Sequence, residues 1–307
     1  MGAEALNLAL VAAAGSSMLV GAGIVATRHV VAEVPPLTLA LLRYAIGVVC
    51  LLPFGVASWR AARMTATLRD LAAMAALGIG QFAVLIAFMN WGLQHIGAAQ
   101  GALIFSLFPL LTLMLGAALG REEMTARLLA GVLVSIAGVA LSLAPKIAAS
   151  GGSAHAGGWW GELAIFAAAL VGAICSVLYR PYLRRYPTMP VSTYAMAASV
   201  VFLVVAAAGE QWPSRIAAIA APAWAAIVFI GVASAVGYYL WLYALKHESP
   251  TRVTVFLALN PVTAAVLGAV LLGERLHPAL LVALALIAAG LWLSARGSPG
   301  KRQPRTG

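Results

Sequence analysis

Charged residues are scarce in this chain, and cysteines are scarcer. Only 9% of its 307 residues are charged and 63% are hydrophobic, whereas soluble domains have about 25% charged and about 45–50% apolar residues. A single soluble core cannot bury that much apolar surface, so the composition predicts a protein of the lipid bilayer. The two cysteines, Cys50 and Cys175, lie within apolar segments. There a thiol behaves as a small apolar residue, which predicts neither a disulfide scaffold nor a metal site.

Sequence motifs for catalysis and nucleotide binding are also missing. The chain has no G-x-x-x-x-G-K-[ST] loop, which argues against a pump driven by ATP. It has no G-x-S-x-G elbow, H-E-x-x-H pair or clustered Cys/His set. We therefore expect no catalytic residue, no metal and no cofactor, and we do not expect an enzyme.

Long apolar runs are the main feature that the chain does have. A membrane-spanning helix needs about 20 predominantly apolar residues, and ten segments meet or approach that length: 5–26, 36–56, 71–92, 97–119, 126–144, 160–179, 190–208, 222–243, 252–272 and 278–295. The first lacks the basic start and the small-residue cleavage site of a signal peptide, so we predict a retained helix. The expected fold is an all-α integral membrane protein with ten transmembrane helices.

The sequence also repeats itself at a shift of 152 residues, without a gap. The shift superposes identical residues at seven pairs of positions: Arg28 and Arg180, Pro35 and Pro187, His95 and His247, Pro109 and Pro261, Gly116 and Gly268, Glu122 and Glu274, and Gly138 and Gly290. Each copy holds five apolar segments, so the second copy must enter the bilayer from the opposite side. Such inverted repeats are common in secondary transporters, whose substrate site lies between the halves near the midplane. We predict one repeat at 1–147, a linker at 148–158, a second repeat at 159–296 and a basic tail at 297–307.

Lysine and arginine are divided unevenly between the two sides of the predicted membrane. If the N-terminus is cytoplasmic, fourteen of the nineteen lie on that side, four lie on the other, and Arg43 lies within the second segment. This excess indicates that both termini are cytoplasmic. This uneven distribution explains the net charge of +10, so the charge does not indicate binding to nucleic acid. We expect the lipid bilayer and a small-molecule substrate as partners, and no nucleic acid.

Short motifs at matched positions resemble those of a known family. LGRE at 119–122 is matched by LGER at 272–275, and SLFP at 106–109 is matched by ALNP at 258–261. Together with ten segments in two halves, they resemble the drug/metabolite transporter superfamily, and specifically its EamA-type exporters, over about 6–296. Within that group the chain looks most like the bacterial inner-membrane exporters of aromatic and other amino acids.

The resemblance implies a basket of ten helices around a central cavity, in a multi-pass protein of the bacterial inner membrane. The cavity walls would come mainly from helices 1, 3, 4, 6, 8 and 9. Small four-helix relatives carry a glutamate in helix 1 for proton-coupled drug efflux, whereas the corresponding stretch here reads AAAGSSMLVGAG, with Ser17 as a cavity candidate and no acid. Each half alone would expose a cavity-lining face, so we expect a monomer that contains both halves.

The expected function is export of aromatic and other neutral amino acids by alternating access, as facilitated diffusion. Proton coupling usually requires an ionisable group at depth in the membrane, and all nine acidic residues lie at segment ends or in loops. The alternative is a broader metabolite or drug exporter coupled to a proton gradient. A passive channel is a further alternative, which saturable uptake with counterflow would exclude.

Two matched prolines, Pro109 and Pro261, are candidate hinges. Within a helix, proline removes one hydrogen bond and frees the carbonyl four residues earlier. Such breaks would let helices 4 and 9 bend, or would offer backbone polarity to a substrate. Ser106 and Asn260 lie beside the prolines and are cavity candidates. In the alternative interpretation the prolines are static kinks.

Two amide side chains lie in the third segment. Gln81 and Asn90 are nine residues apart, and a rotation of about 100° per residue puts them on opposite faces of a helix. Asn90 continues a stripe of small residues, which is typical of a helix-packing seam. We therefore prefer Gln81 as the substrate contact and Asn90 as a structural residue.

The eighth segment carries the aromatic run GYYLWLY at 237–243. Tyr238 and Trp241 share one helix face with Ser234. Their rings would stack on an apolar substrate and offer a hydroxyl to its polar end; alternatively, they belong to the belt of Tyr and Trp at the membrane interface. Tyr44 and Tyr179 are further candidates for the cavity wall.

Three charged residues complete the candidates. Arg43 lies about 10 Å from the outer end of its segment; it either attracts a substrate carboxylate, or extends outward or pairs with a helix end. Glu122 and Glu274 lie just before helices 5 and 10. A carboxylate there stabilises the positive helix terminus, so we assign both to the scaffold.

Overall fold

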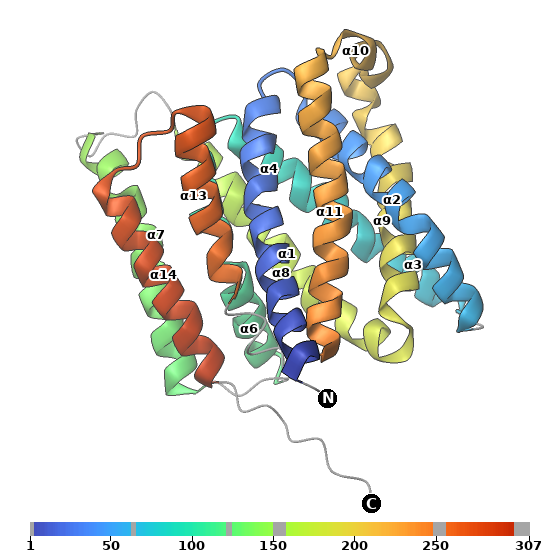
Figure 1. The fold of residues 1–307 in the computed structure, drawn as a ribbon, viewed down its shortest axis with the longest axis horizontal. Helices are drawn as coiled ribbons and strands as arrows, with labels where there is room; N and C mark the ends of the chain where they lie inside the picture. The colour runs from blue at the N-terminus through green and yellow to red at the C-terminus, as the bar shows by residue number, and fades with distance from the viewer. Residues whose placement is uncertain (1–2, 63–65, 121–124, 150–157, 248–255, 298–307) are drawn as a thin grey trace, which may run out of the picture.

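The computed structural model describes residues 3–62, 66–120, 125–149, 158–247 and 256–297, and every regular element in those ranges is a helix (Figure 1). The first half contains α1 (Ala3–Val30), α2 (Pro36–Ala61), α3 (Leu68–Gly78), η1 (Ile79–Val84), α4 (Leu85–Leu93), α5 (Ala98–Phe105), α6 (Phe108–Ala118) and α7 (Ala126–Ala149). The second half contains α8 (Trp160–Arg185), α9 (Thr188–Ala206), η2 (Ala207–Glu210), α10 (Trp212–Ala218), α11 (Ala221–His247), η3 (Phe256–Ala258), α13 (Leu259–Leu272) and α14 (Pro278–Gly297).

Seven stretches in the described ranges are long and apolar enough to cross a bilayer. They are Leu8–Val30, Pro36–Ala61, Leu68–Leu93, Ala98–Ala118, Trp160–Arg185, Thr188–Glu210 and Ala221–Trp241. Three further apolar helices, Leu129–Leu143, Phe256–Leu272 and Pro278–Gly290, are shorter in the part of the chain that the structure describes. They coincide with the other three predicted segments. The all-helical membrane fold is thus confirmed, while the number of ten spans stays a prediction.

The fourth and ninth predicted segments are interrupted just before their prolines. α5 ends at Phe105 and α6 begins at Phe108, so Pro109 occupies the first turn of α6. The 3-10 helix η3 precedes α13, and Pro261 lies in the first turn of α13. In a first turn the missing proline N–H removes no helix hydrogen bond. The prolines therefore lie where the helix segments start; whether they act as hinges stays a prediction.

Helix packing follows the repeat that the sequence shows. α1 packs against α11 and α13, and its counterpart in the second half, α8, packs against α4 and against α5 and α6. α2 packs against its own counterpart α9, α5 against α13, and α7 against α14. These packed pairs between the halves therefore either have a mate at the shift of 152 residues or join a helix to its own counterpart.

The α7–α14 pair lies at one side of the molecule (Figure 1). Equivalent glycines allow its helices to approach closely. A Cβ at Gly138 would lie 3.0 Å from the carbonyl oxygen of Ala283, and one at Gly290 would lie 2.6 Å from that of Gly131. Small residues at such crossings are typical of helix packing in membranes, where backbones meet directly.

We call the two ends of the bundle the Pro36 end and the Arg185 end. At the Pro36 end, uppermost in Figure 1, α1 ends and α2, α5, α8 and α11 begin. At the Arg185 end α8 ends and α9 begins, and α1 begins and α14 ends on this side of the picture.

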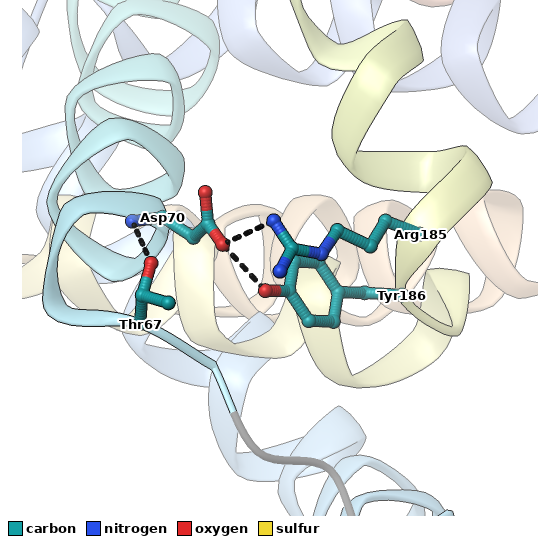
Figure 2. Close-up of polar contacts among 4 residues, drawn as sticks. All are labelled: Thr67, Asp70, Arg185 and Tyr186. Carbon is teal, nitrogen blue, oxygen red and sulfur yellow. Dashed lines mark hydrogen bonds and ion pairs between the residues drawn. The ribbon is translucent and has the colours of Figure 1, made fainter.

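A polar cluster joins α3 to the end of α8 at the Arg185 end (Figure 2). The Asp70 carboxylate accepts hydrogen bonds from Nη1 of Arg185 at 3.0 Å and from the Tyr186 hydroxyl at 2.6 Å. Thr67 caps α3, because its Oγ1 accepts from the Asp70 N–H at 3.2 Å. The hydrogen bond to Asp70 raises the pKa of Tyr186, since it stabilises the protonated phenol.

Candidate functional site

Arg43 is a half-buried cation in the middle of the bundle, between α2 and α11. Its Nε donates to Oγ of Ser234 at 2.8 Å, and that hydroxyl donates to the carbonyl of Ile230 at 2.6 Å. Its guanidinium carbon lies 5.6 Å from the ring centroid of Tyr44. The guanidinium thus contacts the middle of α11 and no helix end. In the described part of the chain the Arg43 side chain contacts a hydroxyl and a ring, and the one ion pair found there joins Arg185 to Asp70.

Tyr238 lies one turn beyond Ser234 on α11 and reaches a third helix. Its hydroxyl forms a short hydrogen bond with the hydroxyl of Ser192 on α9. Sequence reasoning missed Ser192, whose one signal was a polar side chain within an apolar segment. The face of α11 that was predicted from Ser234 and Tyr238 therefore contacts both α2 and α9, which are equivalent helices of the two repeats.

Tyr44 extends this group toward the third span. Its side chain is 5% exposed and meets the ring of Phe82 edge to face, with centroids 5.3 Å apart and planes at 65°. Phe82 was also missed by sequence reasoning, because one phenylalanine among many apolar residues gives no signal. We call Arg43, Tyr44, Phe82, Ser234 and Tyr238 the central cluster.

Gln81 lies beside Phe82 in η1, which is a π-helix. Its Oε1 is buried and has no hydrogen-bond partner among the described residues. A buried polar atom without a partner costs about 1–3 kcal/mol, and π-helical turns within α-helices occur frequently at functional sites. This acceptor, on the residue before Phe82, is therefore available to a ligand that donates a hydrogen bond.

Asn90 contacts the start of α2. It is fully buried, and its Nδ2 donates to the carbonyl of Pro36 at 2.8 Å. The expectation that Gln81 and Asn90 lie on opposite faces assumed a regular α-helix. Gln81 lies within the π-helix η1, which the sequence does not indicate and which changes the rotation per residue. That the two side chains lie on opposite faces therefore stays a prediction.

Three other candidates have their contacts outside the central cluster. Tyr179 donates to the carbonyl of Met74 at 3.3 Å and so ties α8 to α3. Ser106 uses its hydroxyl on its own helix, donating to Leu103 at 2.5 Å. Trp241 packs against the buried cluster at the N-terminal part of α1.

The polar side chains of Ser17 and Asn260 lie on α1 and α13, which pack together. Both are at least 95% buried, and neither Oγ of Ser17 nor Oδ1 of Asn260 has a hydrogen-bond partner among the described residues. The neighbouring backbones are close, since a Cβ at Gly21 would lie 2.5 Å from the carbonyl oxygen of Asn260. These two candidates therefore belong to the α1–α13 interface.

The contacts of the acidic residues differ from those that the sequence suggests. Glu122 lies outside the described residues. The Glu274 carboxylate does not bind the helix that follows it; its oxygens accept from the N–H groups of Ala98 at 2.7 Å and Ala99 at 3.3 Å, at the start of α5. Glu162 is in the first turn of α8, as expected for a segment end, but it is only 6% exposed and accepts from Nε2 of Gln100 at 3.2 Å.

Two surface pockets of about 320 Å³ each lie away from the central cluster. The first is at the Pro36 end and is lined by residues that include Gln100, Glu274, Arg275 and His277. The second lies between α2 and α9 toward the Arg185 end, with Trp59 and Tyr194 in its wall. Neither is the predicted central cavity; protein side chains fill the space around buried Tyr44 in this conformation.

The sequence matches the EamA-like transporter family twice, over residues 7–144 and over residues 159–296. A protein of Streptantibioticus cattleyicolor named "Probable terminal-alkyne amino-acid exporter" is 34% identical over 236 residues, which cover 76% of each chain. An uncharacterized transporter of Archaeoglobus fulgidus is 26% identical over 90% of this chain and 94% of its own.

The fold is also similar to that of a solved crystal structure. The two chains are 21% identical and superpose with a TM-score of 0.64, over 96% of this chain and 97% of the other. At this identity the similarity supports the fold and carries no information on substrate.

Proposed function

Because the chain belongs to the EamA-like transporter family, we propose that it exports amino acids across the bacterial inner membrane by alternating access. The two family matches and the mated helix contacts support two inverted five-helix repeats, at 1–147 and 159–296. The relative named as an amino-acid exporter supports the substrate class. The uneven distribution of Lys and Arg supports cytoplasmic termini, and a single chain with both repeats is the proposed unit.

Arg43 carries the substrate assignment. A cation within a transmembrane helix is energetically costly and is by default a functional group, and Arg43 contacts a hydroxyl and a ring among the described residues. A substrate carboxylate would supply the missing negative charge, and guanidinium groups bind carboxylates through two parallel hydrogen bonds.

The rest of the amino acid has complementary groups nearby. The unpaired Oε1 of Gln81 would accept from the substrate ammonium. The rings of Tyr44, Phe82 and Tyr238 would surround an aromatic or apolar side chain, because offset and edge-to-face ring contacts stabilise such pairs. A neutral amino acid presents all three features in one molecule.

We propose that transport is facilitated diffusion, driven by the gradient of the substrate itself. The central cluster contains no carboxylate, so it has no group that would exchange a proton as access alternates. A second candidate, a broader exporter coupled to protons, is favoured by one observation: Glu162 is a buried carboxylate. Its place in the first turn of α8, away from the central cluster, makes it the weaker candidate.

Uptake of labelled phenylalanine and threonine into proteoliposomes tests the proposal. We expect saturable uptake that is indifferent to an imposed pH gradient and competed by phenylalanine but not by phenethylamine, which lacks the carboxylate. Arg43→Gln should reduce uptake at least tenfold, corresponding to about 1.4 kcal/mol or more of lost binding, whereas the exposed-site control Arg69→Gln should transport normally.

Three results would contradict parts of this proposal. Uptake that requires the pH gradient, and that Glu162→Gln abolishes, would establish proton coupling. If phenethylamine competed as well as phenylalanine, Arg43 would not bind the substrate carboxylate. Uptake of a cationic dye without amino-acid uptake would establish the broader drug exporter.

A further inference from the structure

The two repeats exchange helices to form two groups. α1 packs with α11 and α13, whereas α8 packs with α4, α5 and α6. The groups meet where α5 packs against α13. If alternating access, as in the proposed function, moves these groups against each other, the contact between α5 and α13 must open at one end of the bundle in one of the two states.

Glu274 joins α13 to α5 at the Pro36 end. Its backbone N–H donates to the carbonyl of Gly268 at 3.1 Å and so closes the last turn of α13, after Gly273 in the left-handed region at φ 66°. Its carboxylate accepts from the first two N–H groups of α5, those of Ala98 and Ala99. One residue therefore ends a helix of one group and caps a helix of the other.

Two glycines leave the space that the Glu274 carboxylate occupies. A Cβ at Gly97 would lie 3.1 Å from the carboxylate, and a Cβ at Gly268 would lie 2.9 Å from its Oε2. The carboxylate thus fits between the N-terminus of α5 and the last turns of α13. A charged acceptor on helix N–H groups forms one of the stronger kinds of hydrogen bond, and the helix dipole adds to it.

Water can enter when this contact opens. The pocket of about 320 Å³ at the Pro36 end is lined by Ala99, Glu274, Arg275 and His277. Separated amides and carboxylate would therefore become hydrated instead of remaining buried without partners, which would otherwise cost about 1–3 kcal/mol for each group. This arrangement suits a contact that forms and breaks repeatedly.

We propose that Glu274 is the latch of the extracytoplasmic gate: its carboxylate holds α5 against α13 in the state described here and releases α5 when the exporter opens outward. Glu210 makes a chemically similar cap on another helix, since its carboxylate accepts from the N–H groups of Leu37 and Thr38 in α2. It does not lie between α5 and α13 and serves as the matched control.

Cysteine accessibility tests the latch without any transport assay. Ala102 is fully buried and lies one turn beyond Ala98, on the α5 face that approaches Gly268. In a chain carrying Cys50→Ser, Cys175→Ala and Ala102→Cys, we would measure labelling by a membrane-impermeant maleimide on intact cells. Glu274→Gln should raise the labelling rate about tenfold, because two charge-assisted hydrogen bonds weaken in the closed state. Glu210→Gln and the opposite-end variant Asp70→Asn should change the rate less than about twofold.

A second variant separates the latch from loss of folding. Gly97 has φ −69°, which alanine adopts without strain, so Gly97→Ala should act only through its Cβ, by displacing the Glu274 carboxylate. It should raise labelling in the same direction. Unchanged labelling in both variants, with normal elution on gel filtration, would overturn the latch; so would equal labelling in Glu210→Gln. A changed substrate list would overturn the proposed function and leave this result standing.

Discussion

Carboxylates tie the two repeats together at both ends of the bundle, but they do so in different ways. At the Pro36 end the acids belong to the second repeat, and Glu210 and Glu274 bind backbone amides at the starts of first-repeat helices. At the Arg185 end the acid belongs to the first repeat, and Asp70 binds side chains at the end of α8 (Figure 2).

The two ends differ in the groups that the carboxylates bind, and in whether water can take the place of the carboxylate. Helix N-terminal amides have no partner within their own helix, so removing Glu210 takes away their acceptor at the start of α2, and removing Glu274 leaves those of α5 to be hydrated. Arg185 has a side chain that is 62% exposed, and water can replace Asp70 as its partner. Contacts at the Pro36 end should therefore affect stability more than those at the Arg185 end, where water can replace the carboxylate.

Glu210→Ala should give the largest effect in this comparison. It removes an acceptor from the N–H groups of Leu37 and Thr38 and from Oγ1 of Thr38, which should lower stability by about 2 kcal/mol. Thermal denaturation of the purified protein in detergent would measure the loss. Glu210→Gln keeps an acceptor and should lose less; an equal Tm for all three proteins would show that the cap contributes nothing.

Thr38→Val should have an intermediate effect. The substitution removes the 2.7 Å hydrogen bond from Oγ1 to Glu210 and keeps the backbone cap, so about 1 kcal/mol should be lost. In the same assay its Tm should fall between those of the wild type and Glu210→Ala. Because Thr38 and Glu210 share one interaction, the double variant should be less destabilised than the two losses added together.

Asp70→Asn should change stability less than either variant at the Pro36 end. Exposed ion pairs contribute little and are screened by salt. The difference in Tm between wild type and Asp70→Asn should therefore shrink as the salt concentration rises, whereas the Glu210→Ala difference should persist. Salt-independent destabilisation by Asp70→Asn would show that the two ends are alike.

Tyr186→Phe should give the smallest effect, and one that depends on pH. The pKa of Tyr186 is raised above its ordinary value by the hydrogen bond to Asp70. Its contribution is therefore complete below the unfolded pKa of about 10 and is lost as pH rises through the folded value. The small excess of the wild-type Tm over that of Tyr186→Phe should therefore disappear only under strongly alkaline conditions. Measuring the Tm of both proteins from neutral to strongly alkaline pH tests this.

The sequence predicted the membrane fold and the family because both depend on composition and spacing. Apolar runs and the shift of 152 residues do not depend on local side-chain contacts, and the main packed helix pairs between the halves follow that shift. The α11 face with Ser234 and Tyr238 was predictable for the same reason, since helical spacing alone defines it.

Contacts between distant segments were not predictable in the same way. Glu274 was assigned to the adjacent helix because sequence shows only neighbours along the chain, while its partners in α5 lie 175 or more residues away. The π-helix at Ile79–Val84 has no sequence signature, so the regular spacing assumed between Gln81 and Asn90 does not hold there. Ser192 was overlooked because its partner Tyr238 comes from a different segment.

The glycine contact between α7 and α14 has a consequence for biosynthesis. Gly138 emerges from the ribosome long before Gly290, and at about 5–20 residues per second the delay is on the order of 10–30 s. During that time the close-packing face of α7 is in the membrane without its partner, exposed to lipid. The nascent chain must therefore be kept from pairing with other proteins until its last helix is inserted, and a ribosome that stalls near the C-terminus would leave that face open.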